Sequence, residues 1–280
     1  MTNLEEILER GLALADDGEW EAMADHLRDH LADHDEEPAM HCWLGVAERE
    51  LGLEGVAYER FKRAVALGSE DPYVLTTAGN ALAWFDDPGA ETALRTAALI
   101  APDIPLTRLM YGAYLSREGF VKEGLEELEA ARALDVDDPQ IAYELGVGRM
   151  LAGDADGAAD AMGEAVRLDQ EDGWNRVVLG LVLIEADRLD EAITELYEGA
   201  HHRPEDLEAQ LLAALVACAV GSEGLAYDML ERARMRAQEA DLGMIAQVEE
   251  RLDAGPEEAR AMLIDDLGPD EMRQRLKERP

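Results

Sequence analysis

The sequence predicts an all-α fold, an α-solenoid built from stacked helix hairpins. Small residues recur every 34 residues along almost the whole chain. Each interval contains two stretches with the apolar spacing of a helix, and a glycine usually separates them. A single hairpin of this kind cannot bury its apolar stripe, so it must stack on the hairpins before and after it.

The clearest copy of the unit runs from Pro139 to Asp172. Pro139 suits the first position of a helix, where the N–H that proline lacks would have no helical partner. Gly153 interrupts the helical pattern and marks the turn. The apolar residues before it are Ile141, Leu145, Val147, Met150 and Leu151, and those after it are Ala158, Ala159, Met162, Ala165, Val166 and Leu168.

Four sets of small residues repeat in phase with this copy. The first-helix set is Gly11, Gly45, Gly79, Gly112, Gly146, Gly180, Ala214 and Val248. The turn set is Gly18, Gly52, Gly119, Gly153, Gly221 and Gly255. The second helix contributes Ala57, Ala90, Gly124, Ala158, Ala192 and Ala226, then Ala64, Ala97, Ala131, Ala165, Gly199 and Ala233. Every first-helix step is 34 residues except Gly79 to Gly112, which is 33 and places a deletion in the turn 85–89.

This pattern resembles the tetratricopeptide repeat, a helix–turn–helix unit of 34 residues. The pairs Leu44-Gly45, Leu145-Gly146 and Leu179-Gly180 match its first helix, Phe61 and Leu196 its large second-helix position, and Pro102 and Pro204 its closing proline. The usual first-helix tryptophan is mostly absent, and the last repeat lacks the first-helix glycine. The resemblance implies one solenoid over residues 1–280, with repeats starting near 4, 38, 72, 105, 139, 173, 207 and 241 and a capping helix at 269–279.

The joints between repeats share one chemistry. Glu37-Pro38, Asp71-Pro72 and Asp138-Pro139 each place an acid directly before a proline. We expect the acid to cap the free N–H groups of the helix that follows, where negative charge is also favoured. These acids are therefore predicted to be structural.

The composition limits the classes of partner. The chain has 63 acidic and 25 basic residues, a net charge of −38. Such a surface repels nucleic acids and anionic membranes, and it fits either a solubility adaptation or a basic partner. The absence of a long apolar stretch and of a secretory leader predicts a cytoplasmic protein. Cys42 and Cys218 lie five repeats apart, which also fits a reducing compartment.

Catalysis and bound cofactors are not expected. The sequence contains no phosphate-binding glycine loop, nucleophile elbow or paired cysteine motif. His26, His30 and His34 follow one helix face at intervals of four residues, a spacing that can hold zinc or nickel. Solvated or half-buried helix positions are the preferred interpretation, because no second pair of ligands accompanies them.

The resemblance also implies a right-handed superhelix whose first helices line a concave surface. The inward positions of repeats 3 to 7 are largely apolar, which predicts a groove for a peptide strand or an amphipathic helix. The residues selected for this groove are Tyr73, Asn80, Trp84, Leu109, Met110, Tyr143, Val147, Met150, Trp174, Val178, Leu181 and Leu212. A carboxylate clamp, as in chaperone-binding members, is disfavoured because Thr76, Met110 and Glu144 stand where cations would be needed.

The leading hypothesis is a non-catalytic scaffold or adaptor that binds a protein segment, with acidic rims that favour basic flanks. A second copy of the chain is another candidate occupant of the groove. The first alternative is an acidic chaperone or nucleic-acid mimic that masks a basic protein. The second alternative is a metal-responsive protein that uses the N-terminal histidines.

Overall fold

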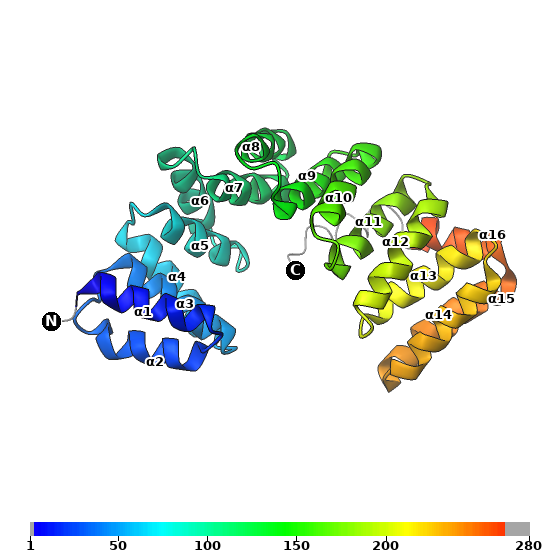
Figure 1. Cartoon of the computed structure of the whole chain (residues 1–280), viewed down its shortest axis with the longest axis horizontal. Coiled ribbons are helices and arrows are strands. Elements are labelled where there is room, and N and C mark those ends of the chain that lie inside the picture. The colour runs from blue at the N-terminus through cyan, green and yellow to red at the C-terminus, as the bar shows by residue number, and fades with distance from the viewer. Residues whose placement is uncertain (1–2, 267–280) are drawn as a thin grey trace. The chain divides into compact units, whose positions relative to one another are not determined.

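The structure, a computed structural model, describes residues 3–266. These residues form helices joined by short turns, in tandem hairpins (Figure 1), so the predicted all-α fold is confirmed. The first helices of the hairpins are α1 (Leu4–Asp16), α3 (Pro38–Glu50), α5 (Pro72–Ala83), α7 (Pro105–Arg117), α9 (Pro139–Leu151), α11 (Gly173–Glu185), α13 (Leu207–Ala219) and α15 (Leu242–Ala254). The second helices are α2 (Trp20–Leu31), α4 (Glu54–Leu67), α6 (Gly89–Ile100), α8 (Val121–Leu134), α10 (Ala155–Leu168), α12 (Leu189–His202), α14 (Glu223–Arg236) and α16 (Pro256–Ala261).

Two short elements complete the chain as described. A 3₁₀ turn, η1 (Glu239–Asp241), precedes α15, and a π-helical turn, η2 (Met262–Asp266), follows α16. The first helices of successive hairpins start at residues 4, 38, 72, 105, 139, 173, 207 and 242. The predicted capping helix at 269–279 lies outside the described residues.

The chain divides into two compact units within α7. The N-terminal unit is Met1–Leu115, and the C-terminal unit is Ser116–Pro280. Within each unit, a second helix packs against the first helix of its own repeat and that of the next: α4 contacts α3 and α5, and α10 contacts α9 and α11. This is the stacking that a solenoid requires. That residues 1–280 form one solenoid stays a prediction.

The recurring small residues have a packing role. In α11, a Cβ added to Gly180 would lie 2.5 Å from Cγ of Leu196 in α12, and in α9 one added to Gly146 would lie 2.7 Å from Met162 of α10. In these two hairpins the helices therefore approach so closely that only glycine fits opposite the large second-helix residue. The small second-helix residues, such as Ala158 and Ala165, are fully buried in the same contact.

The turns explain the other glycine set. Gly18, Gly52, Gly119, Gly153, Gly221 and Gly255 all have positive φ. Two repeats lack a turn glycine, and there Asp86 (φ 51°) and Asp187 (φ 57°) adopt the left-handed conformation instead. Aspartate is one of the few residues that tolerate it. The turn geometry is thus kept where the sequence pattern lapses.

The predicted caps are right for aspartate and wrong for glutamate. Asp71 accepts hydrogen bonds from the N–H groups of Tyr73 and Val74, and Asp138 accepts one from Gln140. Glu37 precedes α3 without a side-chain cap, since its longer side chain is poorly suited to reach back to the first turn. Asp172 caps α11 through two N–H groups, as Asp71 does for α5, and Asp206 caps α13 through the N–H of Ala209.

Candidate functional site

The candidate site is the surface that the first helices make within each of the two units, which we call the first-helix face. The structure places its predicted residues in two different environments. In the N-terminal unit, Tyr73 is 49% and Trp84 50% exposed. Asn80 and Met110 are partly buried, whereas Leu109 is buried.

The exposed part of the face lies on α5. Tyr73 follows the cap of this helix and Trp84 immediately follows its last residue. Positions 7 and 11 residues after Tyr73 fall within about 20° of it around a helix of 3.6 residues per turn, so Tyr73, Asn80 and Trp84 share one side. The sequence therefore placed two open aromatic side chains and an amide on a common surface.

An aromatic contact that the sequence analysis missed lies at the end of α5. The rings of Tyr58 and Phe85 lie 4.9 Å apart, and the Tyr58 hydroxyl donates a 2.8 Å hydrogen bond to Asp87. The bonds that Asp87 accepts from the Gly89 N–H and from Tyr58 lower the pKa of this carboxyl. Phe85, the residue after Trp84, is 40% exposed and adds a further open aromatic side chain.

In the C-terminal unit the corresponding residues are mostly buried. Val147, Met150 and Val178 have no exposed surface, and Leu181 and Leu212 are also buried. All five belong to one core cluster of this unit. In this structure these groove candidates are core residues, because the adjacent helices cover the inward positions that the repeat pattern alone would leave open.

Trp174 and Tyr143 join a polar network within this buried face. The Trp174 indole N–H donates to the Tyr143 hydroxyl at 3.2 Å, and the Arg203 guanidinium lies 5.4 Å from the centre of the Trp174 ring. Burial, reinforced by the nearby Glu144 carboxylate, raises the pKa of Tyr143 to about 12. The hydroxyl therefore stays protonated at neutral pH.

Beside this network, Arg117 and Glu144 form a two-pronged ion pair. The guanidinium Nη atoms donate to the two carboxylate oxygens at 2.6 and 3.0 Å. The side chains are 6% and 10% exposed. Glu144 was identified from the sequence only as standing where a clamp cation would be needed, and its partner Arg117 was not predicted. The available signal was an opposite charge at an inward position of the preceding repeat.

The N-terminal histidines make backbone contacts. His26 Nε2 lies 3.0 Å from the Ile7 carbonyl, and His30 Nδ1 lies 2.9 Å from the His26 carbonyl. The two rings are tilted against each other at 4.9 Å. Between residues 3 and 266, no group of three or more histidine, cysteine or acidic residues is arranged to hold a metal ion.

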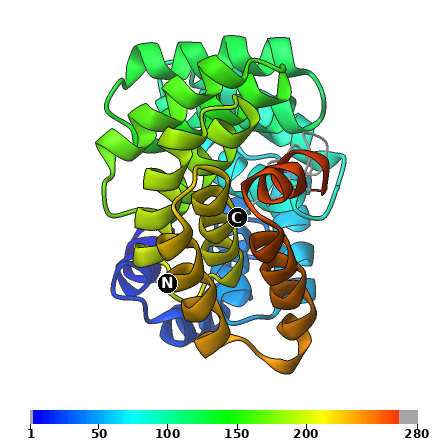
Figure 2. The ribbon, with the colours of Figure 1, turned by 90° about the vertical axis from the view of Figure 1, so that its right-hand side faces the viewer.

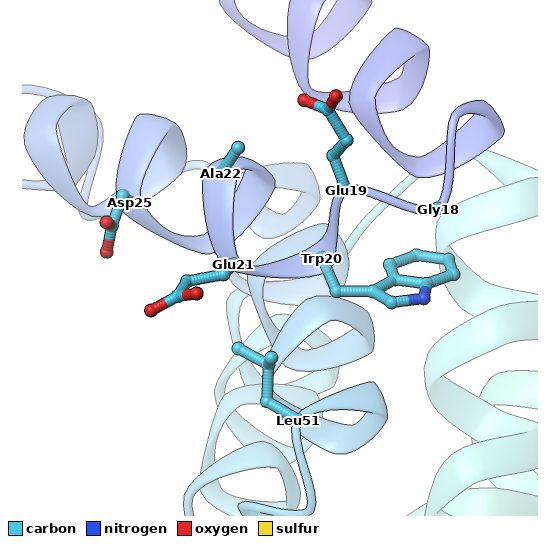
Figure 3. Close-up of a pocket in the computed structure, with 7 residues that line it drawn as sticks. All are labelled: Gly18, Glu19, Trp20, Glu21, Ala22, Asp25 and Leu51. Carbon is cyan, nitrogen blue, oxygen red and sulfur yellow. The ribbon is translucent and has the colours of Figure 1, made fainter.

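A shallow open pocket of about 590 Å³ lies at the α1–α2 turn. Trp20 and Leu51 supply its apolar wall, and Glu19, Glu21 and Asp25 supply carboxylates. Figure 3 shows that these carboxylates point in different directions. The pocket therefore has acidic surroundings but no converging set of ligands.

These hairpins define an α-solenoid protein, and comparison with solved structures identifies its repeat. The chain has the tetratricopeptide-repeat fold. A tetratricopeptide repeat protein from Parabacteroides merdae is 11% identical with a TM-score of 0.62, over 88% of this chain and 97% of that one. The C-terminal part of a repeat protein from Cytophaga hutchinsonii is 12% identical with a TM-score of 0.56, over 84% and 98%.

A further similarity is to a chain in the crystal structure of the APC/C hetero-tetramer Cut9–Hcn1. It is 20% identical with a TM-score of 0.70, and it covers 90% of this chain. This chain spans about half (49%) of that chain's length. No family model matches the sequence, and no curated protein matches it. Along residues 3–266, every helix is too short or too polar to span a membrane.

Proposed function

We propose that the protein is a non-catalytic interaction scaffold that binds a segment of another protein on its first-helix face. The observation that carries the proposal is the half exposure of Tyr73 and Trp84 on one side of α5. Large aromatic side chains are usually well buried, and those left open on a surface are typical anchors of protein interfaces. Asn80 lies between them, with an amide that can both donate and accept hydrogen bonds.

The occupant that fits this surface is a peptide or amphipathic helix with apolar anchors and basic flanks. Two aromatic rings at opposite ends of α5 are separated by 11 residues, a rise of about 16 Å. That length matches about three turns of a bound helix or about five residues of a bound strand. The net charge of −38 favours cations around these anchors.

Binding variants test the proposal. The partner is first captured from native lysate. Trp84→Ala is expected to weaken its binding by about 2 kcal/mol, roughly 30-fold in affinity, because truncating a central aromatic anchor commonly costs this much. Leu99→Ala is the matched control, since Leu99 is 70% exposed but lies on the second helix α6. Equal binding by both variants, measured by calorimetry on the purified pair, would count against the first-helix face.

The charge supports a second candidate, a protein that masks a basic partner with its acidic outer surface. The two candidates differ in salt dependence. Binding through apolar anchors on α5 persists at 0.5 M salt, where a Debye length of only about 4 Å remains. Binding through the distributed charge falls steeply with salt and is insensitive to Trp84→Ala.

A further inference from the structure

The last hairpin departs from the packing of the others. In the C-terminal unit, α10 contacts α9 and α11, and α12 contacts α11 and α13. A second helix thus meets its own first helix and the next one along the chain. By contrast, α16 contacts α15 and, going backwards, α13, while η2 contacts α13 and α11. Figures 1 and 2 show α16 (red) next to the end of α15.

Residues 256–266, which we call the C-terminal segment, therefore lie against the first helices of repeats 6 and 7. The apolar side chains of these helices must be shielded from water. In α13 every residue from Ala209 to Cys218 is buried, and in α11 every residue from Val177 to Ile184 is buried. A helix that is apolar on all sides must be covered on all sides. The predicted groove residues Leu181 and Leu212 belong to these covered stretches.

The C-terminal segment makes this contact as an amphipathic helix does. Ala259 and Leu263 are fully buried in the core cluster, and Met262 packs against it. They stand at positions i, i+4 and i+3, which share one helix face. Ile264, next in the chain, is 46% exposed. Arg260 also forms an exposed ion pair with Asp187 in the α11–α12 turn.

The attachment of the segment is compatible with exchange. It is joined to α15 through Gly255, whose φ of 108° favours glycine, and Pro256. Its α-helix has six residues, too short to be stable without packing. The tether gives the segment a high effective concentration at the face, but the contact uses few side chains. A longer helix from another protein can offer more apolar contacts there.

We propose that the face of α11 and α13 is a binding site for an amphipathic helix of another protein, with the C-terminal segment as its built-in competitor. The partner is expected to share the chemistry of the C-terminal segment. It is a helix with a small residue followed three and four positions later by large apolar residues, and with a basic residue placed to meet Asp187. This inference rests on the proposed role of the first-helix face in protein binding.

The test uses the full chain and a labelled peptide with the sequence of residues 255–266. Leu263→Asp releases the segment by placing a carboxylate in its buried contact, and Ile264→Asp is the matched control at an exposed neighbouring position. Fluorescence anisotropy is expected to show at least tenfold tighter peptide binding by Leu263→Asp than by the wild type or the control. A peptide that itself carries Leu263→Asp is expected not to bind.

Hydrogen exchange of the wild type supplies a second, variant-free readout. Amides of residues 257–264 are expected to exchange together and at least tenfold faster than those of α13. The proposal is overturned if the segment is as protected as α13, or if a folded Leu263→Asp variant binds the peptide no better than the wild type. Dimerisation of the wild type by exchange of this segment would assign the face to a second copy and also overturn it.

The peptide assay involves residues of the C-terminal unit. Its result is therefore separate from the Trp84→Ala experiment on α5. Failure of the α5 surface to bind a partner leaves the peptide result intact, and failure of the peptide assay leaves the α5 surface as the binding site.

Discussion

Gly180 shows how one missing side chain sets the distance between two helices. Its neighbour across the hairpin is Leu196, whose Cγ would lie 2.5 Å from an added Cβ. Several other members of the first-helix glycine set face a large second-helix residue in the same way, including Gly45 against Phe61 and Gly146 against Met162. The repeat is therefore recognisable in the sequence because a close packing contact is repeated.

Replacing this glycine tests that account. Gly180→Ala is expected to destabilise the protein by about 1–3 kcal/mol, since the extra methyl group must displace Leu196 or separate the helices. Gly163 is the control, because it lies in α10 with nothing within 4 Å of an added Cβ. Gly163→Ala is expected to stabilise by about 0.5–1 kcal/mol. Thermal unfolding followed by circular dichroism measures the stability of both variants. A destabilising Gly163→Ala would contradict this explanation of the glycine set.

Tyr143 gives a pH prediction at the same scale. Its pKa is raised to about 12 from the ordinary 10, chiefly by burial. Because the folded-state pKa lies above the unfolded one, its contribution to stability is complete below pH 10 and is lost as pH rises toward 12. Tyr143→Phe is therefore expected to lose less stability than the wild type over this range, by on the order of 2–3 kcal/mol. Equal losses in urea titrations at pH 9 and 12 would contradict this.

The helices differ in whether a side chain accepts hydrogen bonds from the free N–H groups of their first turn. Asp172 accepts bonds from the Trp174 and Asn175 N–H groups at 2.8 and 3.4 Å, and so links the start of α11 to a residue of the candidate site. Glu37 stands at the same place before α3 without such bonds. The two positions form a natural pair for measuring the cap.

Removal of these two side chains should have unequal effects. Asp172→Ala is expected to cost about 1 kcal/mol of stability, the usual value for a lost aspartate cap. Glu37→Ala is expected to change stability by no more than a few tenths of a kcal/mol. Chemical unfolding of the two variants provides the comparison, and similar losses for both would show that the side-chain hydrogen bonds are not the cause.

The helix pattern was predictable from the sequence because its causes are local. Periodicity, turn glycines and acid–proline joints located the hairpins, and Asp86 and Asp187 continued the turns where glycine was missing. Which inward residues are exposed was not predictable in the same way. Tyr73 and Leu212 occupy inward positions of the same repeat pattern, yet Tyr73 is half exposed and Leu212 is buried. The difference depends on what packs over each helix, including a C-terminal segment whose backward contact no repeat pattern specifies.

For the whole molecule, charge is the dominant physical property. With 63 acidic and 25 basic residues, the surface repels itself at low ionic strength. Some of the basic side chains already pair with acids of a neighbouring helix, as in Arg28–Glu48 and Arg176–Glu195. The remaining acids provide long-range attraction for cations, which affects the rate of association with a basic partner more than its final position.

Salt should therefore stabilise the protein. Raising sodium chloride from about 0.05 to about 0.5 M is expected to increase the melting temperature, because screening weakens repulsion between exposed carboxylates more than it weakens buried pairs such as Arg117–Glu144. Potassium chloride at the same ionic strength should give a similar shift. A melting temperature that falls with salt would show instead that ion pairs dominate over repulsion.

The central claim is that the open first-helix face of α5 binds a partner segment through its aromatic side chains. Site-specific photo-crosslinking tests it most directly, with a photoreactive phenylalanine analogue placed at Tyr73 or, as the control, at Leu99 on α6. The claim predicts that one partner segment is crosslinked from position 73 at both low and high salt and is not crosslinked from position 99. Equal crosslinking from the two positions, or loss of the position 73 product at 0.5 M salt, would contradict it.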